Sequence, residues 1–304
     1  MVITKIQGGL GNQMFQYAIG RHLAYLNKTE LRLDLSFYNQ IPKNNTQRKY
    51  LLGNFNITGK PLNLSEEKKV KIKNLHNRPF LTKIIRKILK NIEEKKPIYK
   101  RKYIREPHFH FCPDVLKARN KTIYLYGHWQ SEKYFKNIEN IIRKEFTLKN
   151  GLSNEAKNIL EKIQKTNSVS IHIRRGDYVE NKKNCTLYGV CSLTYYYKTI
   201  KIIQNKTGNP HFFVFSDDIR WVQKNLKTAS SLTLVRGVNI RDFEEIILMS
   251  KCKHNIIANS TFSWWGAWLN NNPNKIVIAP KPWFNIATIN TKDLLPPLWI
   301  TIDK

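Results

Sequence analysis

Residues 170–179 read S-I-H-I-R-R-G-D-Y-V and bring together side chains that can bind phosphate. Arg174 and Arg175 end an apolar stretch, and Gly176 and Asp177 follow them directly. A guanidinium group offers two parallel charge-assisted hydrogen bonds, a geometry that suits a diphosphate. Asp177 can equally pair with a neighbouring arginine and hold the turn. The segment therefore predicts either an anion site at the end of a strand or an arginine pair that is salt-bridged to nearby acids in a loop.

The residues before the arginines have the pattern of a short buried β-strand. Apolar residues at 169, 171 and 173 alternate with Ser170 and His172. Because side chains alternate between the two faces of a strand, His172 and Arg174 should lie on one face and Arg175 on the other.

A glycine-rich turn occurs near the N-terminus, in the run G-G-L-G-N-Q that begins at Gly8. This turn points backbone N–H groups and the Asn12 amide at any ligand above the following helix, which makes Gly9 and Asn12 candidate binding residues. The spacing matches neither G-x-G-x-x-G nor the P-loop, so a glycine turn without a ligand is the alternative. We expect a strand at 2–6, a helix at 14–26 and a strand at 31–35 around this turn.

A hydroxyl-rich turn follows a predicted strand at 255–258, in the run N-S-T-F-S-W-W that begins at Asn259. Ser260 or Thr261 can cap the next helix, and the cap position is also where a phosphate would bind. The tryptophans at 264, 265 and 268 are predicted to be core residues rather than a stacking platform, because 264 and 268 share a helix face.

Taken together, these segments resemble the bacterial α-1,2-fucosyltransferases, glycosyltransferase family 11. The resemblance runs from about residue 1 to 300, is weakest between about 56 and 105, and preserves the order and approximate separations of four motifs. These are G-G-L-G-N-Q-M-F-Q-Y at 8–17, H-I-R-R-G-D-Y-V at 172–179, F-S-D-D at 215–218 and N-S-T-F-S-W-W at 259–265. The family implies an α/β fold of GT-B type, with two Rossmann-like domains whose parallel sheets face each other across a cleft. It also implies GDP-β-L-fucose as donor, inversion at the fucose carbon, and no metal ion or other cofactor.

The resemblance assigns phosphate-binding roles to the strand end and the two turns. Arg174 is expected to neutralise the β-phosphate as the fucose–oxygen bond breaks. His172 is expected to hydrogen-bond the diphosphate or the fucose, and Arg175 to support the loop or reach the α-phosphate. Gly9 and Asn12 are further donor-binding candidates. The hydroxyl turn is similar to the family's phosphate- and ribose-contacting turn, with Ser260, Thr261 and Ser263.

A guanine base needs a carboxylate that accepts from its N1–H and exocyclic amine. Related fucosyltransferases use an acid on the helix before the hydroxyl turn, which here falls on Glu245, with Asp242 as the alternative. Glutamate stands where the family often has aspartate. Asp217 and Asp218 resemble a metal-binding pair, but the resemblance favours a structural or nucleotide-contacting role for Asp217.

The identity of a catalytic base stays open. An inverting displacement would use a carboxylate or imidazole to take the proton from the galactose 2-hydroxyl. Asp177 is the nearest candidate within a motif, although it could pin the turn instead. If the transition state is loose and needs little base assistance, Asn12 or His172 would only orient the acceptor hydroxyl.

The length of 304 residues and the 41% hydrophobic content suit two domains of ordinary size. We expect an N-terminal α/β acceptor-side domain at 1–152, with a basic helical insertion at about 60–105, and a C-terminal GDP-fucose-binding domain at 153–304. Alternating strand and helix patterns predict a parallel sheet in the second domain. Its strands are expected at 169–173, 211–215, 232–235, 255–258 and 275–279.

No apolar run approaches the ~20 residues of a membrane span, and the N-terminus lacks a signal-peptide core. Four cysteines, at 112, 185, 191 and 252, have no metal-site spacing and are expected to be free thiols of a reducing compartment. These features favour a cytoplasmic enzyme, peripheral at most on the inner membrane.

The formal net charge of +30 is concentrated in residues 60–105, where 16 basic residues stand against 4 acidic ones. A helix at 80–92 would carry a stripe of seven large apolar residues with lysine and arginine opposite. Such a helix either lies on an anionic membrane surface or packs into the N-terminal domain. Nucleic acid is a weaker partner, since no helix-turn-helix, zinc or RNA-recognition motif is present.

The sequence therefore predicts a metal-independent transferase that moves L-fucose from GDP-fucose to the 2-hydroxyl of a terminal galactose. The acceptor would be an oligosaccharide of a surface glycan such as O-antigen, either free or built on a lipid carrier. The alternatives are a GDP-fucose transferase with another linkage or acceptor, and a basic nucleotide- or RNA-binding protein without catalysis.

Overall fold

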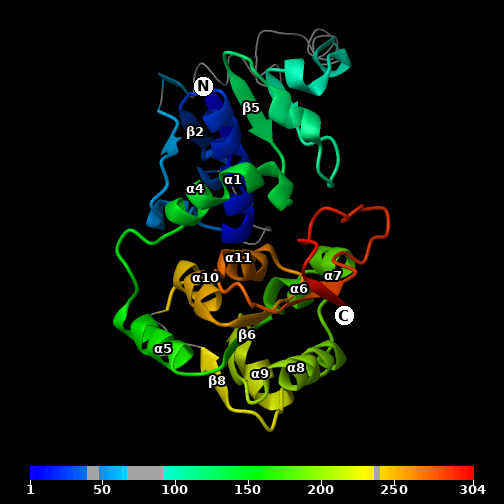
Figure 1. The fold of residues 1–304 in the computed structure, drawn as a ribbon. Coiled ribbons are helices and arrows are strands. Elements are labelled where there is room, and N and C mark those ends of the chain that lie inside the picture. The colour runs from blue at the N-terminus through cyan, green and yellow to red at the C-terminus, as the bar shows by residue number, and fades with distance from the viewer. Residues whose placement is uncertain (40–47, 64, 67–91, 236–239) are drawn as a thin grey trace. The chain divides into compact units, whose positions relative to one another are not determined.

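The computed structural model describes residues 1–39, 48–63, 65–66, 92–235 and 240–304. The chain divides into two compact units, Met1–Phe146 and Thr147–Lys304, each of which is a parallel sheet with helices (Figure 1). The expected helix at 80–92 lies outside the described residues apart from Ile92, which is exposed. Within the described part of the chain, no helix has the length and apolar character needed to cross a membrane.

The first unit is built on a five-stranded parallel sheet of order β3-β2-β1-β5-β4. The predicted strands at 2–6 and 31–35 and the predicted helix are present, but the helix begins at Leu10, directly after the glycine turn. The strands at 60, 103 and 123 were not predicted. The elements are β1 (Val2–Lys5), α1 (Leu10–Leu26), β2 (Leu31–Asp34), β3 (Lys60–Pro61), β4 (Tyr103–Arg105), β5 (Ile123–Tyr126) and α4 (Glu139–Glu145).

A buried carboxylate attaches the last helix of this unit to the first. Glu145 on α4 accepts a hydrogen bond from the Tyr17 hydroxyl at 2.5 Å and pairs with Nε of Arg21 at 2.9 Å, both on α1. Burial and the neighbouring Glu145 raise the pKa of Tyr17 above its usual range, so the phenol stays protonated and donates. Both of these partners come from α1, and the Thr58 hydroxyl, in the segment before β3, donates a third hydrogen bond to Glu145 at 3.2 Å.

The second unit contains a six-stranded sheet of order β11-β10-β9-β6-β7-β8, again parallel throughout. All five predicted strands are present, and a sixth, β11, was not predicted. The strands are β6 (Ser168–Ile173), β7 (His211–Ser216), β8 (Leu232–Val235), β9 (His254–Ile256), β10 (Val277–Lys281) and β11 (Ile300–Asp303).

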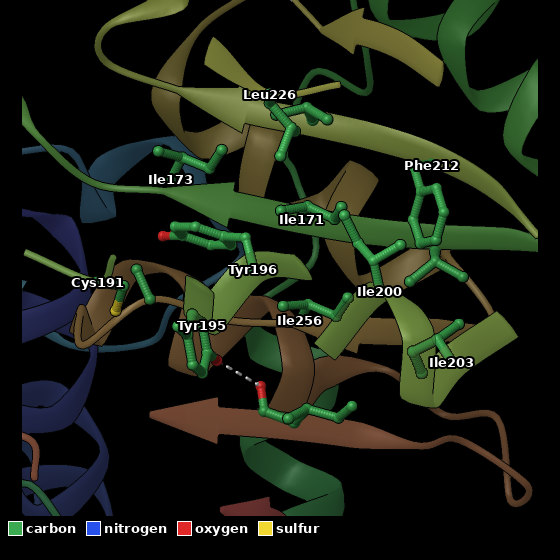
Figure 2. Close-up of a cluster of buried hydrophobic side chains, with 14 of the residues drawn as sticks. Ile171, Ile173, Cys191, Tyr195, Tyr196, Ile200, Ile203, Phe212, Leu226 and Ile256 are labelled. Carbon is green, nitrogen blue, oxygen red and sulfur yellow. Dashed lines mark hydrogen bonds between the residues drawn. The ribbon is translucent and has the colours of Figure 1, made fainter. Parts of the chain in front are cut away.

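Helices cover both faces of this sheet, with α8 and α9 on one side and α10 and α11 on the other (Figure 1). The odd-numbered residues of β6 face α8, and Ile171 packs there with Tyr196 and Ile200 (Figure 2). All six residues of β6 are buried, as expected for a central parallel strand. The helices are α5 (Asn154–Gln164), α6 (Gly176–Glu180), α7 (Lys182–Tyr188), α8 (Leu193–Thr207), α9 (Ile219–Asn225), α10 (Asp242–Lys251) and α11 (Thr261–Leu269).

The three tryptophans of α11 are core residues, as predicted, and none is more than 2% exposed. The C-terminal segment packs on them, because the Trp299 ring lies 5.5 Å from that of Trp264 and the Trp264 indole N–H donates to the carbonyl of Leu294. All four cysteines are free thiols, also as predicted.

Candidate active site

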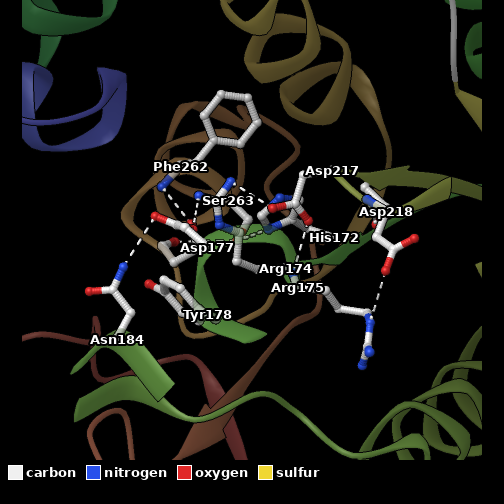
Figure 3. Close-up of polar contacts among 12 residues, drawn as sticks. His172, Arg174, Arg175, Asp177, Tyr178, Asn184, Asp217, Asp218, Phe262 and Ser263 are labelled. Carbon is white, nitrogen blue, oxygen red and sulfur yellow. Dashed lines mark hydrogen bonds and ion pairs between the residues drawn. The ribbon is translucent and has the colours of Figure 1, made fainter. Parts of the chain in front are cut away.

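The predicted phosphate-binding residues of the second unit meet where β6 ends (Figure 3). His172 lies on the face of β6 covered by α11, and its Nδ1 is 2.9 Å from the Ser263 hydroxyl of that helix. Burial, reinforced by the positive charge of Arg174, lowers the pKa of His172 to about 3. The imidazole is therefore neutral near pH 7 and is suited to a hydrogen bond rather than to accepting a proton.

Arg174 is held by two carboxylates. Its guanidinium pairs with Asp217 Oδ2 at 3.0 Å and also with Asp177, which is three residues further along the chain. The group lies 5.5 Å from the centre of the Tyr178 ring. In the free protein Arg174 is therefore neutralised by one acid of its own loop and by one acid at the end of β7, and an incoming diphosphate would compete with these carboxylates or bind beside them.

Arg175 takes a different direction from Arg174 (Figure 3). Its Nε pairs with Asp218 at 3.3 Å, and the guanidinium stacks 4.0 Å from the centre of the Trp221 ring on α9. Its backbone N–H donates to Asp217 Oδ1 at 2.8 Å. These contacts favour the loop-supporting role for Arg175. Asp217 contacts both arginines, through the Arg174 guanidinium and the Arg175 backbone N–H.

Glycine is the residue type that fits at position 176, beside the Asp217 carboxylate. A Cβ added at Gly176 would lie 2.5 Å from Oδ2 of Asp217, well inside any tolerated contact. The close approach of backbone and carboxylate explains why a glycine separates the arginines from Asp177.

The hydroxyl turn caps α11 as predicted. The Ser260 hydroxyl accepts from the N–H of Phe262, and Ser263 turns inward to His172, while Thr261 is half-buried at the start of the helix. The turn itself is held by Asn259, a residue without a predicted role. Its buried amide donates to three carbonyl groups, those of Tyr188, Gly189 and Trp283.

The two acids proposed for guanine lie in the first turn of α10. Asp242 is exposed, whereas burial, together with the nearby charges of Asp242 and Asp217, raises the pKa of Glu245 to about 8. No described side chain or backbone group hydrogen-bonds or pairs with the Glu245 carboxyl. Its neighbour Glu244 is fully buried and is used structurally, since it accepts from the N–H groups of Ser153 and Arg241.

In the first unit, the glycine turn between β1 and α1 contacts the loop after β5. Gly8 has a φ of +76°, which glycine adopts without strain, and Gly9 is the N-cap residue of α1. Asn12 Oδ1 accepts from the Gln130 amide at 2.9 Å, so the side chain expected to face a ligand contacts the loop after β5. This loop was not anticipated from the sequence.

Glu106, directly after β4, is a second unanticipated residue. Its carboxylate accepts from the backbone N–H groups of His128 at 2.6 Å and Trp129 at 2.9 Å. Burial raises the pKa of Glu106 to about 7, although these two hydrogen bonds oppose the shift. An isolated acid after a three-residue strand carries no sequence signal that separates it from a surface residue.

Among the described residues, no group of three or more histidine, cysteine, aspartate or glutamate side chains is arranged to hold a metal ion. Asp217 and Asp218 are instead bound to Arg174 and Arg175.

Comparison with known proteins decides the family. The sequence profile of "Glycosyl transferase family 11" matches residues 1–303. The chain belongs to this family. It is 36% identical to an Escherichia coli α-1,2-colitosyltransferase over 100% of this chain and 99% of that protein. It is 34% identical to the E. coli O-antigen biosynthesis glycosyltransferase WbnK, over 98% and 99% of the two chains.

More distant relatives extend the comparison. The galactoside α-(1,2)-fucosyltransferase 2 of Pongo pygmaeus is 28% identical over 48% of this chain and 44% of its own length. Among solved structures, NodZ α-1,6-fucosyltransferase co-crystallised with GDP covers 87% of this chain, with a TM-score of 0.51 and 11% identity. At 11% identity this comparison shows a shared fold only, and that fold is the expected GT-B type with two parallel sheets.

Proposed function

We propose that this family 11 glycosyltransferase is an inverting galactoside α-1,2-fucosyltransferase that uses GDP-β-L-fucose. The observation that carries the proposal is the cluster at the end of β6, where Arg174, the His172–Ser263 pair and the capped start of α11 meet. The full-length similarity to an α-1,2-colitosyltransferase and to WbnK supports the linkage and an O-antigen-type acceptor.

The leaving group in this reaction is GDP, and its departure places negative charge on the β-phosphate. Arg174 supplies a fixed positive charge and paired donors for that charge. The N-terminus of α11 at Ser260 and Thr261 adds backbone N–H groups and the positive end of the helix dipole. With these groups in place we propose a reaction that needs no metal ion.

We propose that Glu245 binds the guanine base of the donor through hydrogen bonds. Its carboxyl is largely buried and has no partner among the described residues, so it is available to accept from the N1–H and the amine of the base. The carboxyl has to lose its proton to do this, because a protonated acid would point a donor at two donors. Asp242, which is exposed, is the weaker candidate.

GDP-colitose is a second candidate donor, because the 36% identical relative is a colitosyltransferase. Colitose is L-fucose without its 3-hydroxyl group, so both sugars offer the same reacting carbon and the same 6-methyl group. The two donors would differ only in the hydrogen bonds made to position 3.

The decisive experiment incubates the protein with lactose and either GDP-fucose or GDP-colitose, with and without EDTA. We expect a trisaccharide whose new sugar is α-1,2-linked to galactose, as shown by nuclear magnetic resonance, and an unchanged rate in EDTA. A rate that falls in EDTA and returns with Mn²⁺ or Mg²⁺ would refute metal independence. Release of GDP without sugar transfer, or a product with another linkage, would refute the assigned reaction.

A further inference from the structure

The second unit has a hollow at the edge of its sheet where the strands begin. The hollow has a volume of about 530 Å³ and lies where α10 and α11 end and β9 begins. Its described lining comes from the segments 250–254 and 269–274. Arg174 and the hydroxyl turn follow the ends of β6 and β9, so they lie at the opposite edge of the same sheet. A volume of this size is typical of a site for a small organic molecule.

Two lysines give this hollow a positive charge. Lys251 ends α10 and Lys253 precedes β9, and both are exposed. Neither forms an ion pair with a described residue, and no aspartate or glutamate belongs to the described lining. Two ammonium groups without an acidic partner favour an anionic ligand, with which they form charge-assisted hydrogen bonds.

His254 adds a neutral donor whose hydrogen position is fixed. Its Nδ1 accepts the backbone N–H of Ile276 at 3.0 Å, so the ring hydrogen is on Nε2. Burial, together with the charge of Lys253, lowers the pKa of His254, and the ring is neutral near pH 7. Nε2 has no acceptor among the described residues, although the residue is only 8% exposed. An oxygen of an anionic ligand in the hollow would accept this hydrogen.

The carbonyl groups at the helix ends do not offset this character, because other side chains of the unit already bind them. The Asn270 amide donates to the Cys252 carbonyl at 2.8 Å, and the Asn272 amide donates to the Lys253 carbonyl at 3.0 Å. Nζ of Lys275 donates to the Asn270 carbonyl at 2.7 Å, which brings a further positive charge close to the lining. The hollow therefore presents mainly hydrogen-bond donors to a ligand.

The rest of the lining narrows the choice of anionic ligand. The side-chain amides of Asn271 and Asn274 have no partner among the described residues, and an amide can both donate to and accept from a hydroxyl group. No phenylalanine, tyrosine or tryptophan is among the described lining residues, so a nucleobase would lack a ring to stack on. These groups suit a phosphate that carries a sugar or another polyol rather than a nucleotide.

We propose that this hollow is a second ligand site, which binds a phosphorylated sugar or polyol. Lys251, Lys253 and His254 hold the phosphate group, while Asn271 and Asn274 hydrogen-bond the hydroxyl groups. A sugar phosphate in solution and the glycerol phosphate headgroup of an anionic lipid share this chemistry. The inference goes beyond the proposed function, because no residue of this hollow has a part in the proposed transfer.

The test compares two double variants of the full chain. The hollow pair is Lys251→Ala with Lys253→Ala, and the α8 pair is Lys198→Ala with Lys201→Ala, which removes two charges at exposed positions elsewhere in the same unit. Calorimetry measures the affinity for glucose 1-phosphate, inorganic phosphate and glucose. We expect the wild-type protein to bind glucose 1-phosphate more tightly than either of the others. The hollow pair should bind it at least about tenfold more weakly than the α8 pair, because each lysine loses a charge-assisted hydrogen bond.

Asn271→Ala tests the hydroxyl contacts separately. This variant should bind glucose 1-phosphate more weakly than the wild-type protein does, with an unchanged affinity for inorganic phosphate. All the substituted positions are exposed, so the variants should fold, which a thermal melt checks. If the hollow pair does not fold, Asn271→Ala decides the question.

Three outcomes would overturn the site: no measurable binding of glucose 1-phosphate to the wild-type protein, equal affinities of the two double variants for it, or glucose binding as tight as that of its phosphate. Sedimentation with phosphatidylglycerol vesicles then distinguishes the two sources of the ligand. A larger loss of vesicle binding in the hollow pair than in the α8 pair assigns the site to a lipid headgroup, and equal losses assign it to a soluble sugar phosphate. None of these results bears on fucose transfer, which is measured independently.

Discussion

Arg174 is already paired with Asp177 and Asp217 before any donor binds. These two ion pairs fix the guanidinium in place, so a donor bound at the proposed site would meet a preorganised positive charge. Preorganised charge costs little reorganisation during the reaction, which is why such groups can contribute strongly to rate.

We predict that Arg174→Lys lowers kcat by about 10²–10³, because lysine retains the charge but loses the paired donors. The control is Arg175→Lys, whose side chain contacts Asp218 and Trp221 and should cost much less activity. Steady-state rates at saturating donor and acceptor make the comparison. A larger loss in Arg175→Lys than in Arg174→Lys would move the diphosphate role to Arg175.

Glu245 gives donor binding a predicted pH dependence. The pKa of its carboxyl is about 8 in the free protein, so at pH 6 to 7 the group is mostly protonated and must release its proton to accept from guanine. GDP affinity should therefore rise between pH 6 and 8, and binding below about pH 8 should release a proton. Calorimetry in buffers of different ionisation enthalpy measures that release.

Glu245→Gln should weaken GDP binding by about 1–3 kcal/mol, the cost of facing an amide donor toward buried donors, and should abolish the proton release. Asp242→Asn, an exposed change in the same turn of α10, should keep GDP binding but should move its pH dependence to lower pH, because the charge of Asp242 contributes to the raised pKa of Glu245. If Asp242→Asn weakens GDP binding while Glu245→Gln does not, the guanine contact belongs to Asp242.

At the scale of single residues, sequence spacing placed His172 and Arg174 at the end of one strand, because alternation along β6 is strict. It could not predict which acids neutralise Arg174, since Asp217 comes from a different strand end. Nor could it reveal the raised pKa of Glu106 or Glu245, because burial depends on neighbours distant in sequence.

Among the elements, the turn between β9 and α11 is stabilised by Asn259. Its amide satisfies three carbonyl groups from two other segments, and its own Oδ1 lies 3.6 Å from the buried thiol of Cys191. The same turn begins the helix that carries Ser260 and Ser263. Stability and the position of the proposed phosphate contacts therefore depend on one side chain.

Asn259→Ala should destabilise the protein by at least about 2 kcal/mol, because each buried carbonyl left without a partner costs about 1–3 kcal/mol. Urea unfolding measures the loss, and Asn271→Ala, at an exposed position just beyond α11, should change stability by less than about 0.5 kcal/mol. Equal stability of the two variants would show that water replaces the Asn259 amide.

Sequence analysis missed four short strands, β3, β4, β5 and β11. The longer strands and α1 have clear periodicity, and the structure contains them within a few residues of the predicted bounds. β3 and β4 have only two and three residues, which is too short for a pattern. β5 and β11 have four residues each, as many as the detected β1, so length does not explain why they were missed. These strands form by pairing with strands already in place, which is a tertiary effect.

On the scale of the whole molecule, the net charge of +30 should drive binding to anionic membranes. Each basic residue near such a surface contributes roughly 1 kcal/mol, and residues 60–105 hold 16 of them. We expect the protein to co-sediment with vesicles rich in phosphatidylglycerol, to ignore phosphatidylcholine vesicles, and to dissociate as salt is raised.

A charge-matched pair of variants tests where the binding surface lies. Lys83→Glu with Lys87→Glu should weaken vesicle binding more than Lys198→Glu with Lys201→Glu, which alters two exposed positions of α8. Equal losses would mean that membrane affinity follows net charge alone and that the 80–92 segment has no special part in it.

The distribution of thiols has a practical consequence for spectroscopy. Cys191 and Cys252 are buried, and burial raises the pKa of both, so they should react slowly with maleimides, whereas Cys185 is exposed on α7. Its neighbour Asn184 donates to Asp177, the partner of Arg174. After replacement of the half-buried Cys112 by serine, a fluorophore on Cys185 should report donor binding as a change in emission, without any substitution in the residues that we propose contact the donor.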